Sequence, residues 1–313
     1  MYFSIFIVFT ILMIILIGIL WYIEGYRYIC LNRTESLLDL DRQYEDLPRV
    51  KSKKRVVVSL TTIPDRIDKL IPTLSSIYTQ SVKVDQIILN IPYVSRKGQK
   101  YVIPSYFKYI AQQSCNKRKA DIGQQSCLKY CKHIKINRVI DTGPSTKLLP
   151  TLKLFSSDEN TRIIVIDDDQ IYGSCFIEKL MDIFESKRGK VAVTNYGAEM
   201  KTSSWDRVSK YGLGEGYVDI LFGCGGYVVT PKMFPPNVFD YSVAPESAIY
   251  VDDNWFSGWL RYNNVKIYMM GLKMGTCFFL SSATLGSISL SGGPNKNKKH
   301  EKIVNKWFRD FIN

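Results

Sequence analysis

The sequence is poor in the residues that mark a disulfide scaffold or a zinc module. Its 313 residues include only two histidines and seven cysteines, and the cysteines form no even, dense framework of the kind that stabilises small secreted domains. Cys115, Cys127, Cys131 and His133 lie near one another in the sequence. Their spacing matches no common zinc module, so a loop disulfide or free thiols are favoured over a zinc site.

The chain also lacks a basic helix interleaved with aromatic residues. Its formal net charge of +13 suits an anionic partner, which could be nucleic acid, an anionic membrane surface or the phosphates of a nucleotide. Because the lysines and arginines are scattered along the chain, we expect no nucleic-acid binding and favour the other two partners.

Residues 1–23 contain no charged side chain. This stretch is long enough to cross a bilayer as a helix, and Trp21 and Tyr22 stand where an interfacial aromatic anchor is expected. A cleaved signal peptide is disfavoured, because no basic region precedes the apolar run and no small-residue cleavage site follows it. We predict a single N-terminal membrane anchor. Its orientation stays open: the arginines that follow favour a cytoplasmic domain, whereas the glycosylation sequon Asn32–Thr34 favours a lumenal one.

The rest of the chain divides into a stem and one domain. Residues 24–54 are polar, mixed in charge and poorly periodic, which is typical of a linker. Over 55–313, short apolar runs alternate with amphipathic stretches, which predicts an α/β domain. The first strand, helix and strand form a right-handed crossover unit that is typical of nucleotide-binding sheets. The predicted strands and helices are strands 56–62, 84–90, 134–139, 163–166, 191–195 and 265–270, and helices 67–78, 106–112, a helix capped by Ser174, and 303–312.

The main functional signal is the segment RIIVIDDDQ at 162–170. Its apolar half suits a buried parallel strand, and its acidic half suits the point where that strand reaches solvent. Alternation along an extended backbone places Asp167 and Asp169 on one side and Asp168 on the other. Two carboxylates that face one point favour a divalent cation, which at the carboxyl end of a strand can hold a diphosphate. The alternative is a solvated acidic turn.

Three other segments contain candidate nucleotide-binding residues. Arg66 can pair with phosphate or stack on a base, or it can be an exposed residue at a helix start. Lys147 follows a turn that leaves free backbone amides at a helix start, an arrangement that suits phosphate. Glycines in FGCGGYVV let the backbone approach a ligand closely, or they form a plain β-bulge. The candidates are Thr61, Thr62, Arg66, Lys147, Gly225 and Gly226.

A second acidic point, Asp252 and Asp253, precedes an aromatic amphipathic stretch at 255–260. We expect one aspartate to cap the helix and the other to act as a general base. The aromatic residues would then lower the local dielectric and hold an acceptor sugar. Two capping acids are the alternative. His300 is a candidate metal ligand, although chance exposure is the favoured interpretation.

Taken together, these segments resemble the GT-A class of glycosyltransferases, of the family 2-like type that carries a DxD motif. The resemblance covers about 55–270, and its first three segments most resemble a group of viral, bacterial and algal sugar transferases. It implies a Rossmann-like nucleotide-sugar-binding fold with a mixed central sheet. The matching segments, in chain order, are VVVSLTTIPDRI, DTGPSTKLLPTL, IIVIDDDQIY, FGCGGYVV and VDDNWF.

The resemblance also implies roles for the acidic residues. Asp169 is expected to ligate Mn²⁺ or Mg²⁺, Asp167 to contact the ribose or the metal, and Asp168 to belong to the nucleotide site. The SLTTIP loop and Lys147 are expected to hold the nucleotide. Asp253 is carried over as the general base with its neighbour beside it, although this chain has DD where many inverting relatives have ED. The third metal ligand, often a histidine, has only His300 as a candidate.

The sequence therefore predicts a membrane-anchored hexosyltransferase. Its donor is expected to be a nucleotide sugar, most readily a UDP-sugar, and its acceptor a hydroxyl of a glycan, glycoprotein or glycolipid, with inversion at the transferred carbon. Two alternatives remain from other classes. One is a metal-dependent nucleotidyltransferase or phosphohydrolase, and the other is a non-catalytic, membrane-tethered carbohydrate-binding protein.

Overall fold

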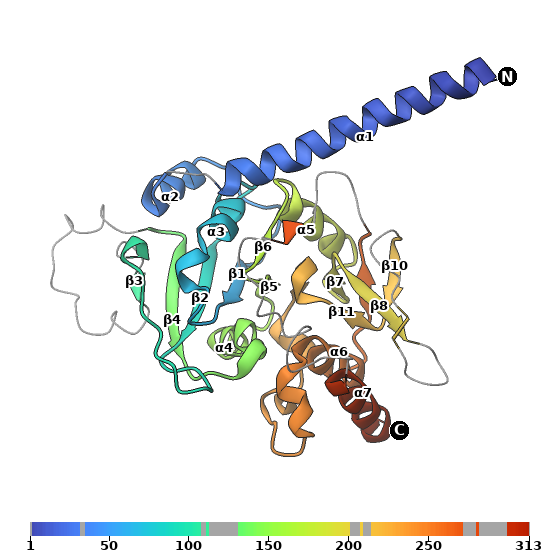
Figure 1. Ribbon diagram of the computed structural model, residues 1–313. Coiled ribbons are helices and arrows are strands. Elements are labelled where there is room, and N and C mark those ends of the chain that lie inside the picture. The colour runs from blue at the N-terminus through green and yellow to red at the C-terminus, as the bar shows by residue number, and fades with distance from the viewer. Residues whose placement is uncertain are drawn as a thin grey trace.

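The centre of the molecule is a nine-stranded mixed sheet with the strand order β10-β13-β7-β12-β5-β1-β2-β4-β3. The computed structural model describes residues 2–31, 35–107, 111–112, 131–200, 207–208, 214–271, 280–281 and 299–312. Helices cover both faces of the sheet (Figure 1), which confirms the predicted α/β class and a mixed sheet. The strands of this sheet are β1 (Val56–Thr61), β2 (Gln86–Pro92), β3 (Ala111–Gln112), β4 (Ile134–Val139), β5 (Arg162–Val165), β7 (Ala192–Thr194), β10 (Gly216–Val218), β12 (Tyr227–Val229) and β13 (Ile267–Met269).

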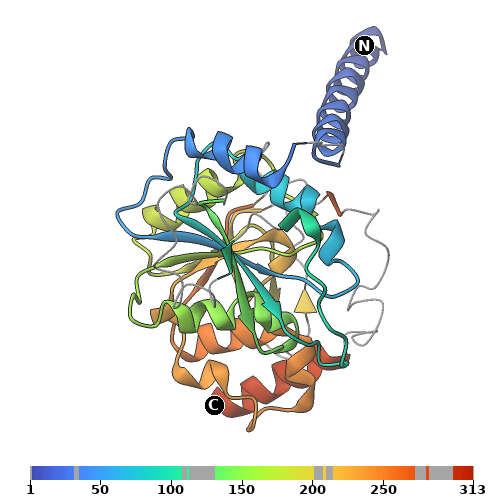
Figure 2. The same ribbon diagram turned by 90° about the vertical axis from the view of Figure 1, so that its left-hand side faces the viewer.

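Two small sheets and the helices complete the domain. One face of the central sheet carries α2 (Leu37–Glu45), α3 (Ile71–Tyr78) and α5 (Phe176–Ser186), and the other carries α4 (Leu149–Leu154), α6 (Asp252–Tyr262) and α7 (Lys299–Ile312) (Figure 2). The small sheets contain β8 (Gly197–Met200), β9 (Arg207–Val208) and β11 (Ile220–Leu221), and β6 (Gln170–Ile171) with β14 (Leu280–Ser281). The 3₁₀ helices are η1 (Ile67–Lys69), η2 (Ser105–Phe107), η5 (Gly143–Lys147), η6 (Gly223–Gly225), η7 (Pro231–Met233), η8 (Pro236–Phe239) and η9 (Glu246–Tyr250).

The strands at the middle of the sheet determine where a site can form. β1 lies between β2 and β5 and runs parallel to both, so their carboxyl ends meet at one edge of the sheet. β12 runs antiparallel between β5 and β7, which makes the sheet mixed. The strands of this centre are buried on both faces, as expected for apolar runs covered by helices. The segment after β1 therefore lies beside the acidic segment after β5.

Several predicted elements differ from the structure in detail. The helix predicted over 106–112 is wrong at its end, because Ala111–Gln112 pair with β4 as an edge strand. Pro72 lies in the first turn of α3, after the separate turn η1, so it begins a helix rather than kinking one. The N-cap of α5 is Cys175, which makes no side-chain cap bond, rather than Ser174. The predicted core face of α5 is confirmed, since its five residues Phe176, Ile177, Leu180, Met181 and Phe184 are buried.

Helix α2 belongs to the folded domain, although its sequence was predicted to be stem. Leu37, Leu40 and Tyr44 are almost fully buried and face the core on one side of the helix. Asp41, on the same side, is also buried and accepts hydrogen bonds from the Tyr78 hydroxyl (2.9 Å) and from the backbone amides of Lys132 (2.5 Å) and His133 (3.0 Å). The linker interpretation of 24–54 is therefore wrong for this helix.

Replacing Asp41 with alanine is expected to destabilise the domain by roughly 3 kcal/mol, because two buried donors and one partly buried donor lose their acceptor. Burial raises the pKa of Asp41, but the hydrogen bonds from His133 and Lys132 outweigh it and hold the pKa below its usual value. This contribution is present above about pH 4 and is lost as the pH falls through the folded-state pKa. Urea denaturation at pH 7 and pH 3 measures both effects. The exposed Gln43→Ala, on the same helix, is the matched control, and an equal stability for the two variants would contradict the role of Asp41.

Of the four residues weighed and disfavoured as a zinc site, the structure describes Cys131 and His133. Cys131 is a buried free thiol whose pKa is raised to about 12 by burial, which disfavours the thiolate that zinc requires. The His133 Nε2 atom lies 2.9 Å from a carboxylate oxygen of Glu45. Cys115 and Cys127 lie outside the described residues.

Helix α1 (Tyr2–Leu31) projects from the domain beside α3 (Figure 1). Apolar side chains are exposed along it, including Phe6, Ile14 and Trp21. Among the residues that the structure describes, no helix is long and apolar enough to cross a membrane.

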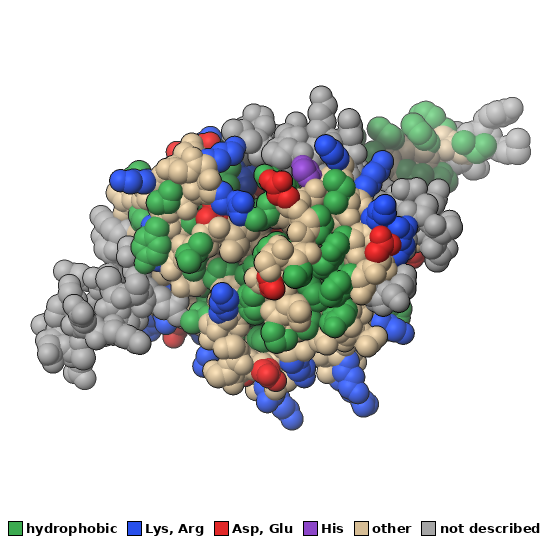
Figure 3. All heavy atoms as spheres, turned by 90° about the horizontal axis from the view of Figure 1, so that it is seen from below, with side chains coloured by type: hydrophobic (Ala, Val, Ile, Leu, Met, Phe, Trp, Pro, Cys, Tyr) green, Lys and Arg blue, Asp and Glu red, His purple; other side chains and the backbone are tan. Residues whose placement is uncertain are grey.

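The face formed by the layer of α4, α6 and α7 is apolar in its middle. Seen from below, hydrophobic side chains gather there, and lysine and arginine lie mainly around the edge (Figure 3). Its helices nevertheless bury most of their aromatic residues, since Trp255 and Trp259 of α6 and Phe308 of α7 are at most 2% exposed. The exposed apolar residues of α6 and α7 are Tyr262, Ile303 and Phe311.

Candidate active site

Five segments meet at the carboxyl ends of β1 and β5. The loop after β1 brings Thr62 and Arg66, η5 brings Lys147, and the loop after β5 brings the three aspartates. The turn η6 and the first residues of α6 close the site from the other side, where the Gly223 backbone amide donates to Asp253 Oδ1 over 2.9 Å. The structure thus brings together the acidic strand end, Arg66, Lys147 and the second acidic point.

Lys147 lies at the centre of this cluster. Its side chain is only 7% exposed, and its Nζ atom lies 2.6 Å from Asp167 Oδ1 and 3.0 Å from Asp252 Oδ2. Burial lowers the pKa of Lys147, but the surrounding carboxylates raise it well above the usual value, so the amine is charged. The Ser59 hydroxyl of β1 donates to the Lys147 carbonyl over 2.5 Å, which holds η5 against the sheet.

Asp252 and Asp253 occupy the first two positions of α6, and neither caps it. The N-cap is Val251, so the predicted capping role is wrong, because these side chains turn into the cluster. Burial raises the pKa of Asp252. It also raises the pKa of Asp253 to about 8, with a further contribution from Asp252. A carboxyl group with a pKa near neutrality is suited to proton transfer.

The other half of the cluster is organised by Arg66. Its guanidinium contacts Asp168 Oδ1 over 2.9 Å and Asp169 Oδ2 over 2.8 Å. Asp168 also accepts a hydrogen bond from the Thr62 hydroxyl (2.6 Å). Burial raises its pKa to about 7, which Arg66 opposes. The Thr61 hydroxyl donates to the Asn90 carbonyl instead.

The three aspartates after β5 alternate as predicted. The side chain of Asp168 is 5% exposed, whereas those of Asp167 and Asp169 are 26% and 32% exposed. Asp168 therefore points into the protein, and its two neighbours face the open side. Each of these two neighbours already contacts a different cation of the protein, Lys147 or Arg66.

The cluster contains more negative than positive groups. Five carboxylates lie against two cations, so its formal charge with every carboxylate ionised is −3. The raised pKa values of Asp168 and Asp253 are a direct effect of burying like charges together. Hard carboxylate oxygens with excess negative charge fit a divalent cation. Within the described part of the chain, however, no group of three or more His, Cys, Asp or Glu residues is arranged to hold a metal ion.

The glycines of FGCGGYVV pack against protein atoms. A Cβ atom on Gly225 would lie 2.5 Å from the Cβ atom of Tyr196, and one on Gly226 would lie 2.4 Å from the ring of Phe176. Gly226 also has a φ of 75°, which favours glycine. Internal packing thus accounts for both glycines, and the neighbouring Gly223 is the one that lies over the cluster.

Replacing Gly223 with alanine is expected to disrupt the cluster. The added Cβ would lie 2.2 Å from Lys147 Nζ and 3.0 Å from Asp167 Oδ1, so this buried ion pair must move. We expect a loss of about 1–3 kcal/mol in the free energy of unfolding, typical of overpacking. Thermal denaturation measures it, with Gly214→Ala as the control because that site has no atom within 4 Å of an added Cβ. Equal melting temperatures for the two variants would refute the close contact.

The predicted aromatic wall does not face the site. Trp255, Phe256 and Trp259 are fully buried and pack inside the domain, where Trp255 and Trp259 contact the Phe308 ring of α7. Trp255 and Trp259 cannot hold an acceptor sugar, because helix α7 covers them, and the Phe256 ring packs against Phe234 inside the domain. The aromatic pattern of α6 reflects the core between two helices.

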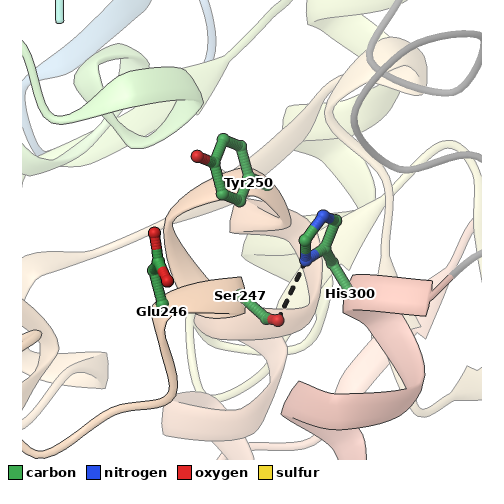
Figure 4. Close-up of a pocket in the computed structure, with 4 residues that line it drawn as sticks. All are labelled: Glu246, Ser247, Tyr250 and His300. Carbon is green, nitrogen blue, oxygen red and sulfur yellow. Dashed lines mark hydrogen bonds between the residues drawn. The ribbon is translucent and has the colours of Figure 1, made fainter.

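His300 lies in a separate pocket beside the cluster. The pocket has a volume of about 290 Å³ and is lined by Glu246, Ser247, Tyr250 and His300. Figure 4 shows His300 Nδ1 facing the Ser247 hydroxyl, 2.9 Å away, with the Tyr250 ring next to the imidazole. The contacts described for His300 do not include Asp167 or Asp169, so the structure does not bring it to the acidic strand end.

Comparison with family models and with curated proteins identifies no relative of this chain. No family model matches the chain, and no curated protein matches it. The case for a function therefore rests on the site itself.

Proposed function

We propose that this protein is a metal-dependent glycosyltransferase of the GT-A type, which transfers a hexose from a nucleotide sugar to a hydroxyl group with inversion. The observation that carries the proposal is the surplus of carboxylates at the carboxyl end of β5 and the start of α6. In open α/β sheets, ligands bind in the crevice beyond the strand ends. The resemblance of the sequence segments to this class points to the same residues.

The metal proposal concerns Asp167 and Asp169, whose side chains face the open side. A bound Mn²⁺ or Mg²⁺ would provide positive charge at the diphosphate leaving group. Its binding to Asp169 requires Arg66 to leave the 2.8 Å contact that it now makes. Arg66 has a buried Nε atom without a hydrogen-bond partner, and a displaced guanidinium suits a phosphate oxygen. In this proposal, the Arg66 guanidinium leaves the Asp169 carboxylate and binds the diphosphate of the donor.

Asp253 is the proposed general base. It sits at the start of α6 with its Oδ1 atom held by the Gly223 amide, and its raised pKa makes it a better proton acceptor than an ordinary aspartate. Lys147, which lies next to Asp252, keeps positive charge between the base and the strand end. Thr62 positions Asp168 and does not itself need to contact the nucleotide.

The experiment that tests the proposal is donor hydrolysis by the full chain. A panel of UDP-, GDP- and dTDP-sugars is incubated with and without Mn²⁺, and the release of nucleoside diphosphate is measured. We expect Mn²⁺-dependent release from one donor. Release of nucleoside monophosphate, pyrophosphate or inorganic phosphate would instead indicate the nucleotidyltransferase or phosphohydrolase class. If no donor of the panel is hydrolysed, and Mn²⁺ with nucleoside diphosphate causes no thermal shift, the remaining interpretation is a carbohydrate-binding protein.

We also propose that residues 1–23 anchor the enzyme to a membrane. The support is the absence of charge in this stretch and the exposed apolar side chains of α1, such as Phe6 and Ile14. The chain expressed from residue 36 on is expected to stay in the supernatant after ultracentrifugation of a cell lysate, whereas the full chain sediments with membranes and resists carbonate extraction. Equal distribution of both forms would contradict the anchor.

A further inference from the structure

The pocket of Glu246, Ser247, Tyr250 and His300 has no role in the cluster described above. Its volume of about 290 Å³ is at the small end of ligand pockets, too small for a whole nucleotide sugar but suited to one sugar ring. Two of its lining residues are aromatic, and their rings contact each other: the Tyr250 and His300 ring centroids lie 4.8 Å apart at an interplanar angle of 35°. The other two carry a hydroxyl and a carboxylate (Figure 4).

The pocket is lined by the segment that directly precedes the proposed base in the chain. Tyr250 is the last residue of η9, and Asp253 follows three residues later in α6. Three residues span at most about 11 Å, so the backbone of the pocket and the backbone of the base are near neighbours. The element that carries the pocket is also held against the site, because Gly143 of η5 packs closely on the Ile249 carbonyl of η9.

The chemistry of the lining selects among ligands. An aromatic face together with several hydrogen-bonding groups suits a sugar ring, which has an apolar face and a rim of hydroxyls. The Glu246 carboxylate accepts hydrogen bonds strongly from hydroxyls but repels phosphate and carboxylate ligands. A metal is disfavoured, because Glu246 is the one carboxylate of the lining and His300 Nδ1 already contacts Ser247.

We propose that this pocket binds a neutral sugar ring of the acceptor, with the Tyr250 ring as its stacking surface and Glu246 as the acceptor of its hydroxyl hydrogen bonds. As an acceptor subsite it rests on the proposed function. As a saccharide-binding site it is tested independently, because binding does not require a donor or a metal. The carboxylate makes the site selective for uncharged sugars over uronic acids.

The test is ligand-observed NMR and calorimetry on the full chain without nucleotide or metal. The probes are glucose, galactose, N-acetylglucosamine and lactose, together with glucuronate and galacturonate. We expect at least one neutral probe to bind with a Kd below about 10 mM and the uronates to bind at least tenfold more weakly. The absence of saturable binding by every neutral probe, or tighter binding of a uronate, would overturn the proposal.

Variants locate the binding to this pocket. Tyr250→Ala is expected to weaken the binding at least tenfold by removing the stacking surface, whereas Tyr250→Phe keeps the ring and stays within about threefold of wild type. Glu246→Gln is expected to weaken neutral-sugar binding about tenfold and to narrow the difference from uronates. Tyr217→Ala, at an exposed tyrosine of β10 that is 52% accessible, is the matched control. Wild-type binding by Tyr250→Ala, with all variants showing the wild-type melting temperature, would refute the assignment.

The outcome is distinguishable from that of the proposed function. Donor hydrolysis by the wild-type chain tests the transferase, and saccharide binding tests the pocket. Saccharide binding without donor hydrolysis would support the proposed sugar pocket and contradict the proposed transferase activity. Donor hydrolysis without saccharide binding would support the transferase activity and contradict the sugar pocket.

Discussion

Replacing Asp253 with asparagine is expected to lower sugar transfer by about 10³-fold, within the range that general-base catalysis contributes. The asparagine keeps the shape of the side chain and can still accept the hydrogen bond that the Gly223 amide donates. It cannot accept the proton of the acceptor hydroxyl. Steady-state turnover with a saturating donor measures the loss, and wild-type turnover would refute the role of the base.

The same substitution is expected to stabilise the fold at pH 8. The folded-state pKa of Asp253, about 8, lies above the ordinary value, so the folded chain binds this proton more tightly than the unfolded chain does. Stability from this group is therefore present below about pH 4 and is lost as the pH rises through about 8. Asparagine removes the dependence, and we expect a gain of about 1 kcal/mol at pH 8, as at other strained active-site positions.

Two controls accompany Asp253→Asn. Asp182→Asn, at an exposed position on α5, is expected to change neither turnover nor stability. Denaturation of each variant at pH 5 and pH 8 gives the pH dependence. A lower stability of Asp253→Asn at pH 8 would show that the carboxylate supports the fold and would contradict the linkage argument.

If the proposed metal role holds, replacing Asp169 with asparagine is expected to lower Mn²⁺-dependent turnover by about 10³-fold or more, because a metal ion can supply several kcal/mol of charge stabilisation at a leaving group. The fold should change little. Asp169 is 32% exposed, and its partner Arg66 still contacts Asp168, so the lost pair is worth at most about 1 kcal/mol.

The measurements for Asp169→Asn are turnover as a function of Mn²⁺ concentration and the thermal shift caused by Mn²⁺ with UDP. Wild-type protein should show a shift, and the variant should show none while keeping its melting temperature without ligand. Asp182→Asn again serves as the control. Full Mn²⁺-dependent turnover in Asp169→Asn would refute the metal role.

The prediction agrees with the structure for elements whose position depends only on the residue pattern within one segment. β4 begins and ends at the predicted residues, Ile134–Val139, and the apolar face of α5 is the buried one. The predicted order of exposure also holds for the aspartates, since Asp168 is more buried than Asp167 and Asp169, although all three follow the end of β5 at Val165. These features depend on spacing along one segment, which the sequence gives directly.

The features that were missed depend on contacts between distant segments. Nothing in the spacing of Lys147 or Arg66 shows that each lies against carboxylates from elsewhere in the chain. The aromatic pattern of α6 predicts a sugar-binding wall, because the sequence does not show which face of this helix α7 covers. Helix α2 did carry a signal, since Leu37, Leu40 and Tyr44 recur at helical spacing, although the surrounding charges obscured it.

The contact between α6 and α7 bears on when the folding of this domain is completed during its synthesis. Gly258 allows the Phe308 ring to approach so closely that any added Cβ would lie 2.2 Å from it, and this contact covers Trp255 and Trp259. On the ribosome, α7 emerges after α6, so a nascent chain exposes these two indoles until α7 docks. The packing of the helix that carries Asp253 is therefore completed only after the strands of the central sheet have been synthesised.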